Sequence, residues 1–306
     1  VFFSNTQYGT QTNRHGYFKI KNVPLELTEL VIAKAGYEND VFRVKDERKH
    51  IALQMTKISD TANSTMQNEA RRFQRQQIAE RFSRLFFGEN VTKCKITNEK
   101  VLDFFYNERT QVLEIYAYAP LLIENFYTGY RIVFVLENFT YFALGGKGRF
   151  SLKGHTFFRQ MVPQIDGSLS VWRKNRTAVF QGSLQNFLHA LAADKLTEAG
   201  FEISLARFST ADRGFVNVGA VMLSQIIHPA LQHEDRFVIK YPDFLEVRYH
   251  RDGEMRTSWL YLNKDYVVIN SSGKTINPFN PFTVHGEWAN QSFSRLLPRG
   301  YSQTPH

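Results

Sequence analysis

The sequence has one cysteine among its 306 residues and no apolar run of about 18 residues, the length of a membrane-spanning helix. A single thiol excludes an internal disulfide and any cysteine-rich zinc module. No segment is of low complexity, and no internal repeat is longer than a hairpin. The apolar fraction of 43% can fill ordinary cores, so we expect a globular protein without a membrane span.

The nine histidines do not form the motif of a zinc peptidase. Such a site needs two closely spaced ligands, typically H-x-x-E or H-E-x-x-H, together with a distant third ligand and an open position for water. The nearest approaches are His233-Glu234 and His285-x-Glu287, and neither has that spacing. We therefore predict no metal site and no cofactor.

Other catalytic motifs are also missing. Gly182-Ser183 lacks the G-x-S-x-G elbow of serine hydrolases, and Ser183 is better placed to cap a helix. The Gly145–Gly148 turn leads into a strand and lacks the P-loop pattern, which indicates a hairpin tip. Cys94 alternates with two lysines, so we expect a buried, unreactive thiol. No catalytic residue is predicted.

Positive charge is in excess, because 38 Lys and Arg against 29 Asp and Glu give a net charge of +9. This balance fits a soluble basic protein, and it also permits binding to nucleic acid or to an acidic surface such as lipid headgroups or polysaccharide. The dense basic group comprises Arg71, Arg72, Arg75, Arg81 and Arg84. The phenylalanines of the same segment follow a buried helical stripe. We therefore interpret these arginines as a solvated face or as a docking surface for an acidic partner.

Aromatic residues make up 14% of the chain, and short β-prone segments alternate with clusters of Gly, Pro and Asn. This pattern is typical of antiparallel sheets. In residues 1–56 it predicts strands at Val1–Thr6, Tyr17–Ile20, Leu30–Ala33 and His50–Met55. The first 56 residues are therefore predicted to form a small β module.

The rest of the chain is predicted to comprise an α+β region over residues 57–210 and a β-rich region over residues 211–306. The α+β region contains two helices near residues 65–87 and 183–199, each followed by a glycine. In the last region, Asp252-Gly253 is the strongest hairpin signal. The predicted fold class is mainly β, with two packed helices in an α+β middle.

Aromatic and polar side chains outside the arginine group are further candidates for partner binding. One helical turn brings Trp172 beside Asn175 and Arg176. This trio is either a recognition cluster or a structural one, in which Trp172 packs the domain and the polar side chains bond to buried carbonyls. Four C-terminal aromatics are either sugar-stacking or half-buried strand residues: Tyr249, Trp259, Tyr261 and Trp288. The candidate partner-binding residues are Arg71, Arg72, Arg75, Arg81, Trp172 and Arg176.

Motifs along most of the chain resemble one known family. The first ones lie in the N-terminal region: Asn13-x-x-Gly16-Tyr17-Phe18, Lys21-Asn22-Val23-Pro24 and Ala35-Gly36-Tyr37-Glu38. They resemble the carboxypeptidase regulatory-like, prealbumin-type β-sandwich, an accessory module. Later motifs follow the order seen in carboxypeptidase-like regulatory domain-containing proteins of Gram-negative envelopes: Glu80-Arg81-Phe82, Gly129-Tyr130-Arg131-Ile132, Phe180-Gln181-Gly182-Ser183 and Gly286-Glu287-Trp288. Gln181 departs from the family, in which an aromatic residue is common there.

The resemblance implies a non-enzymatic binding or scaffolding protein of the cell envelope, located in the periplasm or at the outer membrane. Its partner would be a protein or a glycan of the envelope, and nucleic acid is not expected. The prealbumin-like module is truncated at its start, so we expect its first strand and an export signal upstream of Val1. Two other classes stay open: a peptidase or glycan-active enzyme with an unrecognised site, and a basic nucleic-acid-binding protein.

Overall fold

The computed structural model describes residues 1–24, 26–44, 50–58, 69–107, 109–142, 149–231, 233–276 and 280–301, with the backbone alone for residues 69–74 and 149. Strands make up 42% and helices 20% of it, so the protein is mainly β with α+β character, as predicted. The chain forms two compact units. The first comprises Val1–Val23, Thr28–Asn175 and Ser292–Pro298, and the second consists mainly of Arg176–Gln291.

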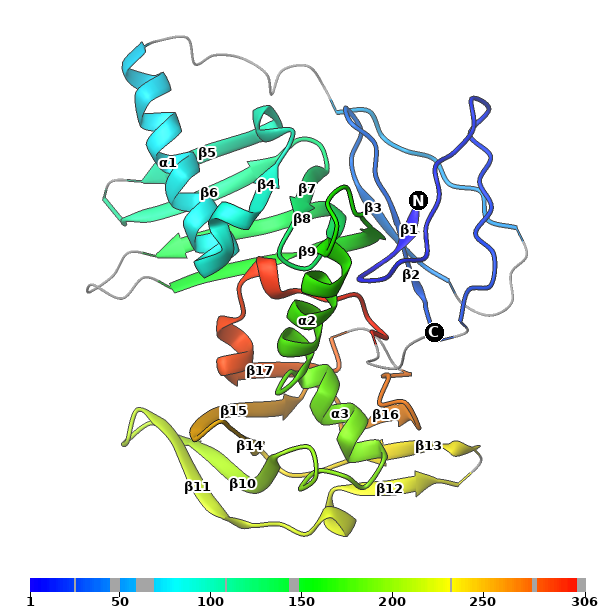
Figure 1. Ribbon diagram of the computed structural model, residues 1–306, viewed down its shortest axis with the longest axis vertical. Helices are drawn as coiled ribbons and strands as arrows, with labels where there is room; N and C mark the ends of the chain where they lie inside the picture. The colour runs from blue at the N-terminus through cyan, green and yellow to red at the C-terminus, as the bar shows by residue number, and fades with distance from the viewer. Residues whose placement is uncertain are drawn as a thin grey trace. The chain divides into compact units, whose positions relative to one another are not determined.

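The first unit contains a three-stranded sheet, a six-stranded sheet and helix α1 (Figure 1). The small sheet has the order β1-β2-β3. The large sheet has the order β4-β7-β8-β6-β5, and β9 pairs along the other edge of β8. The bounds are β1 Phe2–Phe3, β2 Glu29–Ile32, β3 Asp40–Arg43, α1 Glu69–Phe87, β4 Cys94–Ile96, β5 Leu102–Asn107, β6 Val112–Ala117, β7 Leu121–Asn125, β8 Tyr130–Phe142 and β9 Arg149–Gln160.

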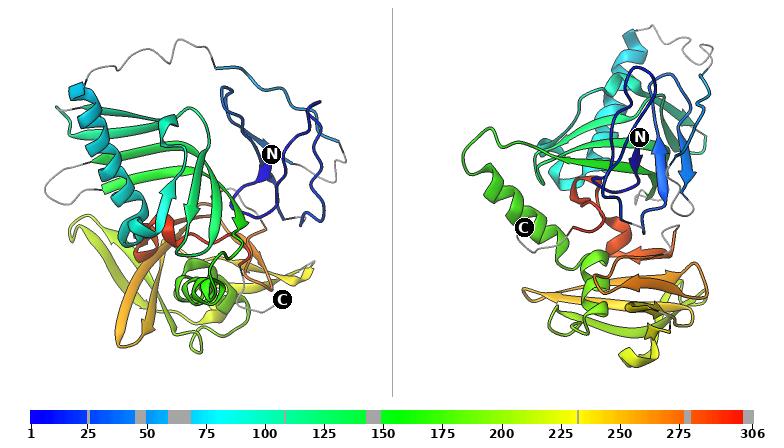
Figure 2. Two further views of the ribbon diagram at one scale, coloured as in Figure 1. Left: turned by 45° about the horizontal axis from the view of Figure 1, so that its top comes forward. Right: turned by 90° about the vertical axis from the view of Figure 1, so that its right-hand side faces the viewer.

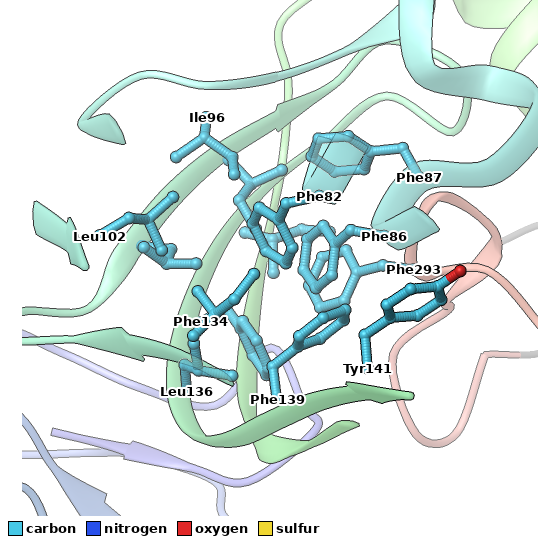
Figure 3. Packing of buried hydrophobic residues seen from close by; sticks show 14 of the residues in the cluster. Phe82, Phe86, Phe87, Ile96, Leu102, Phe134, Leu136, Phe139, Tyr141 and Phe293 are labelled. Carbon is cyan, nitrogen blue, oxygen red and sulfur yellow. The ribbon is translucent and has the colours of Figure 1, made fainter. Parts of the chain in front are cut away.

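The core of the first unit is built from aromatic rings that α1 and the six-stranded sheet bring together (Figure 3). Helix α1 lies across one face of this sheet (Figure 2). Phe82 and Phe86 of α1 are fully buried, and the ring centroids of Phe86 and Phe293 are 4.2 Å apart. Phe82 meets Phe139 of β8 edge-on at 5.0 Å. The described second half of α1 thereby confirms the predicted apolar stripe.

The segment Ser292–Pro298 belongs to the first unit, although the sequence placed it in the β-rich region at the end of the chain. Besides the Phe293 ring, a buried polar network holds it there. Ser294 Oγ donates to the carbonyl of Phe87 at 2.7 Å, and Asn125 Nδ2 donates to the carbonyl of Ser294 at 2.8 Å. Burying these groups without partners would cost free energy, so the segment is tied to the end of α1.

The packing units do not follow the expected boundaries after residues 56 and 210, because the first strands pack on the six-stranded sheet. The ring of Phe2 stacks on Phe157 of β9, with centroids 5.5 Å apart. The backbone N–H of Asn5 donates to the carbonyl of Thr156 at 2.7 Å. The N-terminal segment thus adds both apolar contact and backbone pairing to this sheet.

Two of the four strands predicted in residues 1–56 are not found among the described residues: neither Tyr17–Ile20 nor His50–Met55 pairs in a sheet. Asn13 Oδ1 instead accepts the backbone N–H groups of His15 and Tyr17, which closes a turn. An alternating pattern sets which face of a strand is buried, but it does not supply a neighbouring strand edge. Strand β3 was not predicted.

The second unit contains two antiparallel sheets and helix α3 (Figure 1). The larger sheet has the order β11-β10-β14-β15-β17, and the smaller has the order β12-β13-β16. Side chains from both sheets and from α3 share one core. The strands are β10 Phe201–Ser209, β11 Gly214–Ala220, β12 Ile227–Ala230, β13 His233–Ile239, β14 Phe244–Arg251, β15 Glu254–Leu262, β16 Val267–Asn270 and β17 Phe282–Gly286.

The helix expected near residues 183–199 corresponds to α3, and a further helix, α2, precedes it. Helix α2 spans Ser168–Phe180, and the boundary between the units falls within it. Helix α3 spans Leu184–Ala192, and Ser183 caps it as predicted, since its Oγ accepts the N–H of Asn186 at 3.1 Å. It ends early because Asp194 takes the left-handed φ of 56°. Among the described residues, no helix is both long and apolar enough to cross a membrane.

Candidate functional site

The predicted arginine group lies on α1, and side chains are described for Arg75, Arg81 and Arg84 but not for Arg71 and Arg72. Arg75 forms an ion pair with Asp103 at 3.7 Å. Arg81 donates to the hydroxyl of Tyr141 at 3.1 Å, and its guanidinium lies 4.8 Å from the centre of that ring. These two arginines are therefore engaged by their own sheet, which fits the interpretation as a helix face better than a docking surface.

Trp172 is buried, and both its ring and its N–H are used inside the first unit. Its Nε1 donates to the carbonyl of Phe126 at 2.9 Å. The ring covers Gly129, where a Cβ would lie 2.2 Å from the indole. Asn175 Nδ2 donates to the carbonyl of Tyr127 at 2.7 Å. Of the two roles considered for this cluster, the structural one agrees with these contacts.

Arg176 is also buried, with 5% of the residue exposed. A side chain that the fold covers is poorly placed to meet a partner, so the burial of Trp172 and Arg176 favours the structural role over the predicted partner-binding role. The helical spacing correctly placed the residues one turn apart. It could not show that Trp172 and Arg176 are both buried, since that depends on what packs against α2.

Cys94 is half-buried at the start of β4, rather than buried as predicted. Burial raises the pKa of its thiol to about 12. The thiolate is the nucleophilic form of cysteine, and at neutral pH this thiol is almost entirely protonated. Cys94 is therefore a poor candidate for a catalytic nucleophile.

A chain of hydrogen bonds in the first unit has the group order of a serine-hydrolase triad. His155 Nδ1 lies 2.8 Å from Ser4 Oγ, and His155 Nε2 lies 2.8 Å from Glu137 Oε1. Glu137 also pairs with Lys153 at 2.7 Å. Burial alone would raise the pKa of Glu137, but the hydrogen bonds from Lys153 and His155, with their charges, outweigh burial and lower that pKa.

The surroundings of Ser4 argue against catalysis by these three side chains. Only 6% of Ser4 is exposed, so a substrate has little access to its hydroxyl. The neighbouring backbone N–H groups, which would have to stabilise an oxyanion, are already used. Ser4 N donates to the carbonyl of Glu29 at 3.0 Å, and Asn5 N donates to that of Thr156 at 2.7 Å. The hydrogen bonds from Ser4 through His155 to Glu137 therefore link the N-terminal segment to β8 and β9.

The outer face of the five-stranded sheet in the second unit carries six ring side chains, which we call the aromatic face: Phe208, Phe215, Phe244, Trp259, Tyr261 and His285. Alternation along β14 explains why they lie outside. Leu245 and Val247 are buried in the core, so Phe244 points to the opposite side. Cross-strand pairing then places Tyr261 opposite Phe244.

Ring contacts join these side chains into one cluster. Phe215 stacks on Trp259, with centroids 4.5 Å apart and planes at 13°. Phe244 lies 5.2 Å from Tyr261, and Phe208 lies 5.4 Å from Phe215. Strand β11, which carries Phe215, is three places from β15 in the sheet order. The contact between Phe215 and Trp259 therefore requires β11 to curl over the outer face.

Glu246 lies within the aromatic face, and its side chain is only 6% exposed. It accepts the indole N–H of Trp259 at 3.2 Å and the amide of Asn217 at 3.2 Å. It pairs with Arg248 at 2.5 Å and also accepts the hydroxyl of Ser204 at 3.4 Å. Burying a carboxylate costs several kcal/mol unless such partners offset the cost. These contacts fix the positions of the Trp259 ring and the Arg248 guanidinium.

The aromatic face remains accessible at its edges. Phe208 is 52% exposed, Tyr261 is 41% exposed, and the side chain of Arg248 is 37% exposed. Of the four aromatics singled out in the sequence, Trp259 and Tyr261 belong to this face. Tyr249 is buried in the core, and Trp288 donates its indole N–H to the carbonyl of Gly182 at 2.8 Å.

Sequence reasoning missed Glu246, Arg248 and Phe215. The available signal was the alternation of 244–249, in which a charged residue takes the same face as an aromatic one. Among the described residues, no group of three or more His, Cys, Asp or Glu side chains could hold a metal ion. No family model, curated protein or solved structure matches the chain.

Proposed function

We propose that this chain is a non-enzymatic binding or scaffolding protein of the cell envelope, located in the periplasm or at the outer membrane. The envelope assignment rests on the motifs that resemble carboxypeptidase-like regulatory domain-containing proteins. The observation that carries the binding function is the aromatic face, a cluster of exposed and half-exposed rings on the outside of a sheet.

The composition of this face supports recognition. Trp, Tyr and Arg are the side chains that contribute most to binding energy when a partner covers them, and Trp259, Tyr261 and Arg248 lie together here. Tyr and Trp also lose little conformational entropy on binding, because they have few rotatable bonds. Strands rather than loops carry these residues, so the surface is largely formed before a partner arrives.

Charge argues against a nucleic-acid partner for the same face. Residues 176–291 contain 11 Lys and Arg and 12 Asp and Glu, a net charge of −1. Binding to nucleic acid draws most of its affinity from cationic contacts to phosphates, which this segment does not offer in excess. The positive excess lies in residues 1–175, with 25 basic against 17 acidic side chains. Elution from heparin at modest salt would show that this excess gives only nonspecific attraction.

Co-sedimentation with isolated cell envelopes of the source organism tests the proposed function. We expect the purified chain to sediment with the envelopes, and the double variant Phe208→Ala/Tyr261→Ala to lose most of this binding. Tyr266→Ala is the matched control, because Tyr266 is 50% exposed and lies outside the aromatic face. Circular dichroism checks that each variant is folded. The proposal is contradicted if the parent chain and both folded variants sediment equally, or if the parent chain does not sediment with the envelopes.

A further inference from the structure

We infer that the aromatic face binds an uncharged glycan, by stacking sugar rings on aromatic rings and donating hydrogen bonds to hydroxyl groups at their edges. This inference rests on the proposed function and names its ligand class. Three properties of the face lead to it: paired charges, polar groups among the rings, and ring edges that stay exposed.

The charges of the face are paired within it. Glu246 pairs with Arg248 at 2.5 Å, and on the same face the Glu202 carboxylate lies 3.3 Å from His250 Nε2, an ion pair only when that imidazole is protonated. A polyanion or polycation would have to compete with these pairs for a counter-charge. The nearly neutral balance of residues 176–291 adds no long-range attraction for either sign. An uncharged ligand meets no such penalty.

The polar groups among the rings distinguish a glycan from an apolar protein surface. Covering the partly exposed Arg248 guanidinium with an apolar partner would remove its water without replacing the lost hydrogen bonds. A guanidinium has five N–H donors in a rigid fork, so Arg248 can bond to Glu246 and still donate to a ligand hydroxyl. Asn217 is exposed, and its amide nitrogen is already directed at Glu246, which leaves its carbonyl oxygen to accept from a hydroxyl.

The rings provide the apolar part of the site. One face of a sugar ring is lined by C–H groups and packs against an aromatic ring, whereas its hydroxyls point outward toward polar partners. Phe208 and Tyr261 are the most exposed members of the face, and each contacts a ring held by the cluster. The sheet face of another β architecture, the OB-fold, also binds oligosaccharides. The buried Glu246 then has a positioning role, since it holds the Trp259 ring and the Arg248 fork.

Two treatments of the same envelopes separate this inference from the proposed function. Periodate cleaves vicinal diols of sugars, and proteinase K removes accessible protein. We expect periodate to abolish sedimentation of the parent chain and proteinase K to leave it unchanged. Binding that survives periodate and is lost after proteinase K would overturn the glycan inference and retain the binding function. If the binding to untreated envelopes does not depend on the aromatic face, or is absent, both the glycan inference and the proposed function are overturned.

Titration with soluble uncharged oligosaccharides gives a second readout. Calorimetry with maltohexaose, cellohexaose, chitohexaose and mannohexaose should detect binding of at least one of them. Tyr261→Ala should weaken that binding at least about tenfold, and Tyr266→Ala should leave it unchanged. Glu246→Gln should weaken binding with the fold intact, because it removes the charge that orients Arg248. Binding of none of the four, or equal affinity in Tyr261→Ala, counts against a glycan site at this face.

Discussion

The six-stranded sheet of the first unit and the five-stranded sheet of the second differ in which side of the sheet carries their main aromatic cluster. In the first unit, Phe134 and Phe139 point toward α1 and form the core. In the second unit, β14 and β15 direct aliphatic residues such as Leu245 and Leu260 inward, whereas Phe244 and Trp259 lie on the outer face. Aromatic content alone therefore does not identify a core. The parity of each residue along its strand decides whether a ring stabilises the fold or stays available to a partner.

The two units also differ in charge. Residues 1–175 hold the positive excess, and residues 176–291 are close to neutral. The net charge of +9 is therefore distributed unevenly, between one basic region and one nearly neutral region. The balanced region carries the aromatic face, which separates the candidate binding surface from the general attraction of a basic protein for anions.

The largest expected loss of stability comes from the aromatic core of the first unit. Phe86→Ala removes a fully buried ring that stacks on Phe293. We expect it to lower the free energy of unfolding by about 3–5 kcal/mol. Phe105→Ala is the control, because Phe105 is 57% exposed, and it should cost less than about 1 kcal/mol. Urea denaturation measures both, and similar losses would show that Phe86 is not a core residue.

Neighbouring residues on β14 test the assignment of faces in the second unit. Leu245 is fully buried, so Leu245→Ala should cost about 2–5 kcal/mol. Phe244 lies on the outer face and is half-buried, so Phe244→Ala should cost roughly 1–2 kcal/mol despite its larger side chain. Denaturation midpoints give the order. A greater loss of stability for Phe244→Ala than for Leu245→Ala would show that Phe244, and not Leu245, faces the core.

A pair of glycines that both have positive φ tests the packing of Trp172. Gly129 has φ 69° and would direct a Cβ into the indole at 2.2 Å, whereas Gly16 has φ 83° and has no atom within 4 Å of such a Cβ. Gly129→Ala should cost about 2–4 kcal/mol, from the left-handed backbone and the clash together. Gly16→Ala should cost only the backbone part, about 1 kcal/mol. Thermal unfolding compares them, and equal shifts would show that the Trp172 contact does not matter.

The cap of α3 should have a smaller effect. Ser183→Ala leaves the N–H of Asn186 without its acceptor at 3.1 Å, which typically costs about 1 kcal/mol. Ser183→Asp should restore most of this loss, because aspartate also caps helices well. Denaturation of the two variants decides the question. If aspartate fails to recover stability, the hydroxyl does not act as a cap.

The weakest expected effect is the pH dependence due to Glu137. Its pKa is lower in the folded chain than its ordinary value of 4.5, so its contribution is fully present above pH 4.5 and is lost as the pH falls through the folded pKa. The stability difference between the parent chain and Glu137→Gln should therefore be constant near neutral pH and shrink in acid. Denaturation at pH 7 and pH 3 measures it. A stability difference that grows in acid would mean that folding raises the pKa of Glu137 instead of lowering it.

Local sequence signals predicted the parts of the fold that are set over a few residues. Ser183 caps α3, and the Asp252-Gly253 turn joins β14 to β15 with positive φ angles of 52° and 80°. The glycine after Phe87 marks the end of α1. Each of these features depends on a nearby hydrogen bond or on one residue's backbone preference, and such preferences can be read without knowing the rest of the chain.

Only the tertiary structure decided which distant segments meet. The packing of Phe293 on Phe86 and the hydrogen bond from Asn217 to Glu246 join residues far apart in the sequence. Trp259 and Tyr261 stood out in the sequence as separate binding candidates, and so did Trp172, which the fold buries. Strand pairing and helix docking determine these outcomes. Their free energy comes from surfaces contributed by several elements at once, so no single segment carries the information.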